Sequence, residues 1–171
     1  MKKFNTVLFQ VHSPQNVGMI IRSHVAFGGE TLVFVGYDQP WSFKSGTQGF
    51  SRKLEKKCRI EYFVSPVGFF EWSKQHEQHN IAIEISSNSK SVINYNYPTL
   101  SNIIVGNERT GIPASFLENC DDILHIPQLG EVECLNVAVS ASIVLFDFAK
   151  ANNIQSKSIQ GSKFNLSNTN P

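Results

Sequence analysis

The sequence predicts an α/β fold in which a parallel sheet is flanked by helices. Six short apolar runs recur along the chain, and each has the length and composition of a buried strand: residues 6–11, 31–36, 60–64, 81–85, 102–106 and 122–126. Helical patterns lie between them, and a strand, helix, strand rhythm favours parallel pairing with helices on both faces. The 171 residues suffice for one domain with a substantial core.

The segments between the strands carry helix signals. After the first strand, Ile20, Ile21 and Val25 share one helical face, and two glycines at 28 and 29 provide a stop. Residues 50–58 and 65–79 are further candidates, the second with a Ser-Pro start. A short helix over 113–120 would place Pro113 in its first turn.

The last helical candidate, residues 134–150, is apolar nearly all round its circumference. A surface helix would show a single apolar stripe, so this helix must be covered on more than one side, by a partner subunit or by an unusual threading of the chain. The following segment is poor in large apolar residues and rich in Asn and Ser. We therefore expect a domain over residues 1–150 and a polar, flexible tail over 151–171.

Composition excludes several classes of protein. The three cysteines are odd in number and lack zinc-ligand spacing, which predicts reduced thiols in a cytoplasmic protein and no metal site. No segment approaches the roughly 20 apolar residues of a membrane span. The N-terminal residues fit a first strand better than a signal peptide. We expect no membrane partner.

Charge is unevenly distributed although the formal net charge is only +1. Residues 44–59 contain six basic side chains and a single acid, Glu55, whereas residues 118–133 contain five acids and no Lys or Arg. The basic run is either a solvated helix face or a patch that faces phosphates, and composition alone leaves both interpretations open.

Three unusual loops follow predicted strands: "HSPQNVG" at 12–18, "GNERTGIP" at 106–113 and "PQLGEVECLN" at 127–136. Ligands bind beyond the carboxyl ends of the strands in such sheets, so the three loops are expected to converge on a site. None matches the dinucleotide or Walker phosphate loops, which disfavours an ATP or dinucleotide enzyme. The glycines at 106 and 111 either only form turns or let the backbone approach a ligand closely.

Three motifs cover most of the first 150 residues: "NVGMIIR" at 16–22, "VGNERTGIP" at 105–113 and "IPQLGEVECLNVAVSASI" at 126–143. In this order and spacing they resemble the SpoU branch (TrmH-like and TrmL-like) of the SPOUT RNA methyltransferases. The resemblance implies a C-terminal deep trefoil knot, bound S-adenosylmethionine and a homodimer. It also implies methyl transfer to a ribose 2′-hydroxyl of RNA. With no added N-terminal RNA-binding domain evident, the chain resembles the minimal tRNA-modifying members more than the rRNA-modifying ones, so we expect tRNA as the substrate.

The resemblance also implies site residues. The catalytic candidates are Asn16, Arg22, Glu108 and Asn136. The cofactor candidates are Gly106, Asn107 and Gly111, together with Cys134, which stands where the family commonly has Ser. Ile85, Ile126 and Leu135 join them as aliphatic walls that suit the flat ring of adenine. The RNA-binding candidates are Arg52, Lys53 and Lys56.

Arg22 is the family's candidate for deprotonating the ribose hydroxyl, but a guanidinium with a pKa above about 12 is a poor base. Clamping a phosphate and stabilising the developing alkoxide suits it better, with phosphate or water as the proton acceptor. Asn16 and Asn136 would orient the ribose and the loops, and Glu108 could fix an arginine or a loop amide. His24 points about 200° away from Arg22 on the helix and is expected to be a packed or interface residue.

Two other functions remain open beside an active methyltransferase. One is an RNA-binding module that retains the cofactor without catalysis, and the other is an unrelated nucleotide-dependent α/β enzyme.

Overall fold

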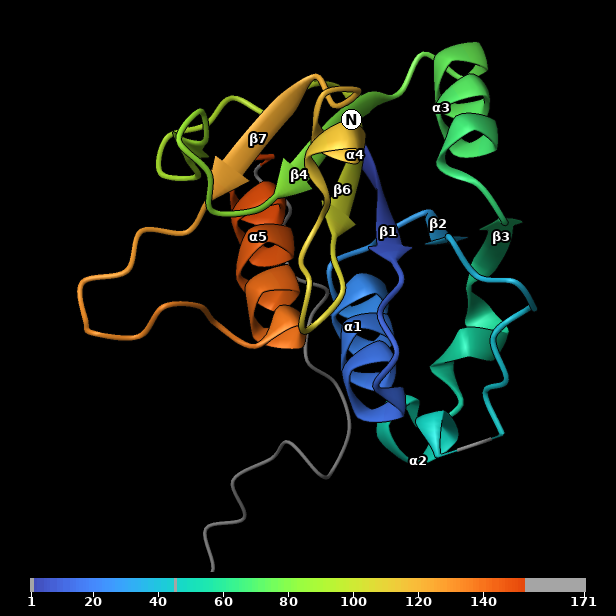
Figure 1. The fold of residues 1–171 in the computed structure, drawn as a ribbon. Coiled ribbons are helices and arrows are strands. Elements are labelled where there is room, and N and C mark those ends of the chain that lie inside the picture. Colours follow the sequence, from blue (N-terminus) through green and yellow to red (C-terminus); the bar gives the residue numbers. More distant parts are fainter. Residues whose placement is uncertain (1, 45, 153–171) are drawn as a thin grey trace, which may run out of the picture.

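A single parallel sheet organises the structure, which is a computed structural model that describes residues 2–44 and 46–152 (Figure 1). The strands are β1 Lys3–Phe9, β2 Thr31–Val35, β3 Arg59–Phe63, β4 His79–Ile83, β5 Lys90–Ser91, β6 Leu100–Val105 and β7 Asp122–His125. Their order in the sheet is β3-β2-β1-β6-β4-β7-β5, and every paired strand is parallel. The predicted α/β fold with a parallel sheet is confirmed.

All six predicted strands are present, although their bounds differ. The first strand begins at Lys3 and ends at Phe9, because Gln10 has a left-handed backbone with φ of 50°. The two-residue strand β5 was not predicted, since Lys90 and Ser91 form no apolar run. Both ends of the sheet order, β3 and β5, contain partly exposed residues, which fits their position as edges.

Helices form where capping residues and apolar spacing coincide. The helices are α1 Pro14–Ala26, α2 Thr47–Ser51, α3 Pro66–Gln75, α4 Ala114–Leu117 and α5 Val137–Ala151, with a 3₁₀ turn, η1, at Leu54–Lys57. Ser13 and Ser65 cap α1 and α3 through their side chains, and a proline follows each cap. This combination satisfies a free N–H group and presets the backbone for the first turn.

Four predicted helix details are wrong. The candidate helix over 65–79 ends at Gln75, and His79 is already the first residue of β4. The candidate helix over 50–58 is broken, because Arg52 and Lys53 have φ of 54° and 60° and separate α2 from η1. The last helix begins at Val137 instead of residue 134, because Asn136 is its N-cap. Pro113 is the N-cap residue of α4 and so lies before its first turn.

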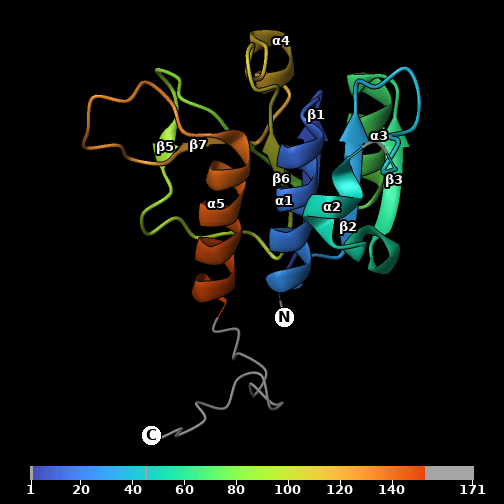
Figure 2. The same ribbon diagram turned by 90° about the horizontal axis from the view of Figure 1, so that it is seen from below.

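Helices cover both faces of the sheet (Figure 2). Adjacent strand residues alternate between the faces, so that Leu8 packs in a cluster with Ala141 of α5, whereas Val7 packs with Phe69 of α3 and Phe116 of α4. Burial of both faces explains why the strands read as continuous apolar runs.

A buried row of asparagines crosses the centre of the sheet. Asn5, Asn102 and Asn80 lie opposite one another on β1, β6 and β4. Asn5 Nδ2 donates to Asn102 Oδ1 at 2.9 Å, and Asn102 Nδ2 donates to Asn80 Oδ1 at 2.8 Å. A one-residue slip would break these bonds inside the core, so the row specifies the strand register.

Helices α1 and α5 lie side by side (Figures 1 and 2). Helix α5 also keeps an apolar face exposed. The hydroxyls of Ser23 and Ser142 are 2.7 Å apart and join the two helices. Val139, Ile143 and Phe146 are 40%, 37% and 57% exposed. The described residues therefore leave one side of the predicted all-round apolar helix uncovered.

The predicted tail over 151–171 falls almost wholly outside the described residues. Ala151 ends α5 and Asn152 caps it, whereas residues 153–171 are not described. Within the described ranges, no helix combines the length and apolar character needed to cross a membrane.

Candidate active site

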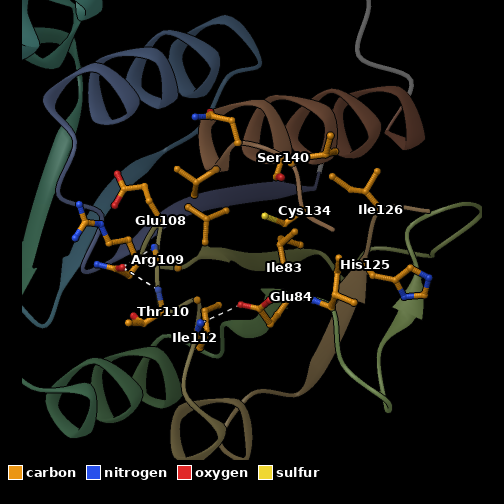
Figure 3. A pocket seen from close by; sticks show the side chains of 18 of the residues that line it. Ile83, Glu84, Glu108, Arg109, Thr110, Ile112, His125, Ile126, Cys134 and Ser140 are labelled. Carbon is orange, nitrogen blue, oxygen red and sulfur yellow. Dashed lines mark hydrogen bonds between the residues drawn. The ribbon is translucent and has the colours of Figure 1, made fainter. Parts of the chain in front are cut away.

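A cavity of about 700 Å³ opens at the carboxyl ends of β4, β6 and β7, beside the start of α5 (Figure 3). All seven predicted cofactor residues line it: Ile85, Gly106, Asn107, Gly111, Ile126, Cys134 and Leu135. Asn16, Glu108 and Asn136 also line it. The structure thus brings together ten predicted site residues, nine from the three motifs and Ile85 from the end of the strand predicted over 81–85.

The loop after β6 is a tight reversal that depends on both of its glycines. Asn107 and Gly111 form an antiparallel bridge, and Gly111 N donates to Asn107 O at 3.0 Å. A methyl group on Gly106 would lie 2.7 Å from the carbonyl carbon of Gly111, and Gly111 has φ of 64°. The geometry of the loop therefore requires glycine at both positions, and the same loop forms one wall of the cavity.

Glu84 is a cavity residue that sequence reasoning missed. Its carboxylate accepts a hydrogen bond from Ile85 N at 3.0 Å. It accepts a second from Ile112 N at 2.9 Å, marked by the dashed line in Figure 3. A methyl group on Gly111 would lie 2.5 Å from Glu84 Oε2. Glu84 thus ties the end of β4 to the glycine loop. The available signal was a single acid inside the apolar run predicted as the strand over 81–85.

Glu108 connects the first two motifs. Its carboxylate accepts hydrogen bonds from His12 N at 3.1 Å, Ser13 N at 2.9 Å and Asn16 Nδ2 at 3.0 Å. Partial burial alone would raise its pKa, but these hydrogen bonds outweigh burial and hold the pKa of Glu108 below its ordinary value. Glu108 therefore holds loop amides, which is one of the two roles predicted for it. A carboxylate that already accepts three hydrogen bonds is poorly placed to act as a base.

Asn136 adds the third motif to the same network. Its Nδ2 donates to Asn16 Oδ1 at 3.1 Å, while its Oδ1 accepts hydrogen bonds from Ala138 N and Val139 N and caps α5. Asn16 is 8% exposed and uses both ends of its side-chain amide, donating to Glu108 and accepting from Asn136. The three motifs are therefore joined by one chain of side-chain hydrogen bonds.

Arg22 lies apart from the cavity. It is exposed on α1, does not line the cavity, and its guanidinium contacts no acceptor among the described residues. Arg22 follows Gly18 by one helical turn, and Gly18 is where α2 packs against α1. The guanidinium is therefore free to meet a ligand that approaches from outside.

His24 is a packed core histidine, as predicted. It is 1% exposed, its Nδ1 lies 2.9 Å from Thr6 Oγ1, and its ring stacks edge-on against Phe4. Burial lowers the pKa of His24 to about 4, so the ring is neutral at neutral pH.

The RNA-binding candidates Arg52, Lys53 and Lys56 are all exposed and lie on the segment of α2 and η1. None of the three lines the cavity. A methyl group on Gly18 would lie 2.5 Å from Phe50 Cβ, so this basic segment is packed closely against α1, the helix that carries Arg22.

Fold and site together define a domain that presents a ligand cavity at the carboxyl edge of a parallel sheet, closed by a glycine-bounded loop. The sequence profile described as the SpoU rRNA Methylase family matches residues 3–146. The chain belongs to this family, and the resemblance read from the three motifs is confirmed.

Two curated relatives and one solved structure illustrate the similarity. The chain is 30% identical over 142 residues to tRNA (guanosine(18)-2'-O)-methyltransferase TARBP1 of Mus musculus, covering 82% of this chain and 9% of the relative. It is 28% identical over 152 residues to 23S rRNA (guanosine-2'-O-)-methyltransferase RlmB of Blochmanniella floridana, covering 87% and 58%. The fold superposes on an AdoMet-bound rRNA methyltransferase from Sinorhizobium meliloti with a TM-score of 0.82 at 23% identity, over 90% of this chain and 57% of that one. The chain thus spans less than two thirds of the length of these relatives.

Proposed function

We propose that the chain transfers a methyl group from S-adenosylmethionine to a ribose 2′-hydroxyl of RNA. The observation that carries this proposal is the single hydrogen-bonded network in which Asn16, Glu108 and Asn136 join all three family motifs at the rim of one cavity. Membership of the SpoU rRNA Methylase family supports the same reaction class.

The residues around the cavity fit this cofactor. Its volume of about 700 Å³ lies within the usual range of small-molecule sites, roughly 300–1,000 Å³. Ile85, Ile126 and Leu135 supply apolar walls for a flat purine, and the backbone of the glycine loop supplies polar groups for its edges. Glu84 also lines the cavity, and its carboxylate has the opposite charge to the sulfonium of the cofactor. The bound cofactor would supply an already activated methyl group.

The chain's own residues then have to position the RNA. Asn16 and Asn136 hold the first and third motifs at a fixed separation, and Glu108 anchors the start of α1 through backbone amides. Arg22, exposed and without a partner in the described chain, clamps a phosphate and stabilises the alkoxide that forms on the ribose. Phosphate or water accepts the hydroxyl proton, because a guanidinium is a poor base.

We further propose tRNA as a more natural substrate than rRNA. The name of the mouse relative, a tRNA methyltransferase, supports this preference. Arg52, Lys53 and Lys56 would contact the RNA backbone, since their side chains are exposed on the segment packed against α1.

The open apolar face of α5 supports a homodimer. Val139, Ile143 and Phe146 recur at helical spacing and remain exposed in one chain, and a second copy of the same face would bury them. We also infer the family's deep trefoil knot in the C-terminal part. Its support is that the segment after β7 returns beside the glycine loop, where Leu135 and Asn136 line the same cavity.

The methyltransferase domain in this proposal is residues 1–150, with 151–171 as a separate polar tail. The unpaired thiols of Cys58, Cys120 and Cys134 fit a reducing compartment, which supports a cytoplasmic location.

Incubation of the protein with bulk tRNA or rRNA and methyl-labelled cofactor, followed by digestion to nucleosides, tests the proposed reaction. We expect label in a 2′-O-methylnucleoside and more of it from tRNA. Cofactor binding with no transferred label would instead select the alternative function, an RNA-binding module without catalysis.

A further inference from the structure

Two neighbouring cations, Arg52 and Lys53, adopt a backbone conformation that suits glycine. Arg52 has φ of 54° and ψ of 38°, and Lys53 has φ of 60° and ψ of 21°. Side chains other than glycine, Asn and Asp meet steric repulsion in this left-handed region. Folding alone would therefore favour glycine at both positions.

A buried polar pair holds the strained backbone in place. Ser51 is 0% exposed, and its Oγ accepts a hydrogen bond from Lys53 N at 3.2 Å and donates one to Glu55 Oε2 at 2.5 Å. Glu55 is 5% exposed, although it sits within a run of exposed basic residues. Its second oxygen, Oε1, is buried and accepts no hydrogen bond from any described residue. Glu55 is thus a buried acid within a run of exposed basic residues, held there by Ser51.

The same segment is fixed to α1 at Ser51. A methyl group on Gly18 would lie 2.9 Å from Ser51 N and 2.9 Å from Thr47 O, so only glycine permits this approach. The side chains of Arg52 and Lys53 nevertheless point to solvent and contact no acceptor among the described residues. The surrounding contacts hold Arg52 and Lys53 in a strained backbone conformation, yet their side chains make no hydrogen bond with the described residues. Such strain indicates that the two side chains bind a ligand.

We propose that the 51–57 turn is a preorganised clamp for RNA phosphates, in which Arg52 and Lys53 contact the backbone and Ser51 and Glu55 are positioning residues. That the polyanion is RNA rests on the proposed function. The turn packs on α1 one helical turn from Arg22, so RNA bound there would pass the arginine assigned to the ribose.

Salt dependence of RNA binding distinguishes a clamp from a diffuse basic surface. For a tRNA transcript titrated against the full chain, Arg52→Ala and Lys53→Ala should each reduce the slope of log affinity against log salt by about 1. Lys57→Ala is the matched control, because Lys57 is also exposed in the same turn but lies within η1 and has no positive φ. It should leave the slope unchanged. Equal losses in all three variants would overturn the clamp.

The positioning role needs a variant that keeps every charge. Ser51→Ala removes the hydroxyl that holds Lys53 N and should weaken tRNA binding about 2- to 10-fold, because the cations must then be ordered on binding. Ser65→Ala is the control, since it also removes a side-chain cap from a backbone amide, but at α3 and away from the 51–57 turn. Equal affinity of Ser51→Ala and Ser65→Ala for tRNA would contradict the proposal.

The strain itself has a separate readout. Arg52→Gly should melt at a higher temperature than Arg52→Ala, because glycine accepts positive φ, while both variants lose tRNA affinity equally. A melting temperature of Arg52→Gly at or below that of Arg52→Ala would refute the strain. Polyglutamate that competes as well as tRNA would refute RNA as the partner. If wild-type protein shows the predicted slopes but transfers no methyl group, the catalytic function fails and the clamp stands.

Discussion

Removal of the Glu108 carboxylate should destabilise the whole site, because three donors converge on it. Glu108→Ala leaves His12 N, Ser13 N and Asn16 Nδ2 without their acceptor. At about 1 kcal/mol for each partly solvated hydrogen bond, the loss is about 3 kcal/mol. For a domain of this size, that corresponds to roughly 6–12 °C in melting temperature.

The pH dependence of stability is a second, independent test of the role of Glu108. Because the pKa of Glu108 is lower in the folded chain, its contribution is fully present above its unfolded pKa and is lost as pH falls through the folded value. Glu108→Gln has no titrating group and should therefore lack this acid-range loss. Thermal unfolding from neutral to acid pH measures both effects. A Glu108→Ala protein that melts with the wild type and shows the same acid limb would refute the network's role.

Four further outcomes follow from the site and the surface. Arg22→Ala should bind S-adenosylmethionine like the wild type in calorimetry but lose single-turnover transfer by roughly 100-fold or more, and Arg22→Lys should rescue poorly; near-normal transfer would end its catalytic assignment. The double variant Lys53→Glu, Lys56→Glu should weaken tRNA binding and flatten its salt dependence. An unchanged slope of log affinity against log salt would show that the basic residues of 44–59 are only a solvated surface. Phe146→Glu should shift the protein to monomer in sedimentation at micromolar concentration, and a monomeric wild type would refute the dimer. Gly111→Ala should abolish cofactor binding in a folded protein, because the methyl group would meet Glu84; retained binding would contradict the loop geometry.

Sequence patterns predicted the sheet well because parallel strands buried on both faces leave a simple signal. Leu32 and Val33 face opposite core clusters, so the run reads as apolar without alternation. Ser13 followed by Pro14 likewise marked the start of α1. Strand β5 left no such signal, since two polar residues at a sheet edge bury little apolar surface.

The errors concern features that depend on contacts distant in sequence. The break between α2 and η1 is stabilised by a buried Ser51 and Glu55 pair, which no local propensity reveals. The role of Glu84 depends on Ile112, which lies 28 residues away.

Alkaline hydrolysis of the RNA product tests the central claim most directly. A linkage next to a 2′-O-methylated ribose resists alkali, because the hydroxyl that attacks the phosphate is blocked. After reaction of the wild-type protein with tRNA and methyl-labelled cofactor, we predict that alkali releases the label in a dinucleotide and leaves one gap in the hydrolysis ladder. Label released in mononucleotides, with an unbroken ladder, would show methylation of a base and contradict the proposed reaction.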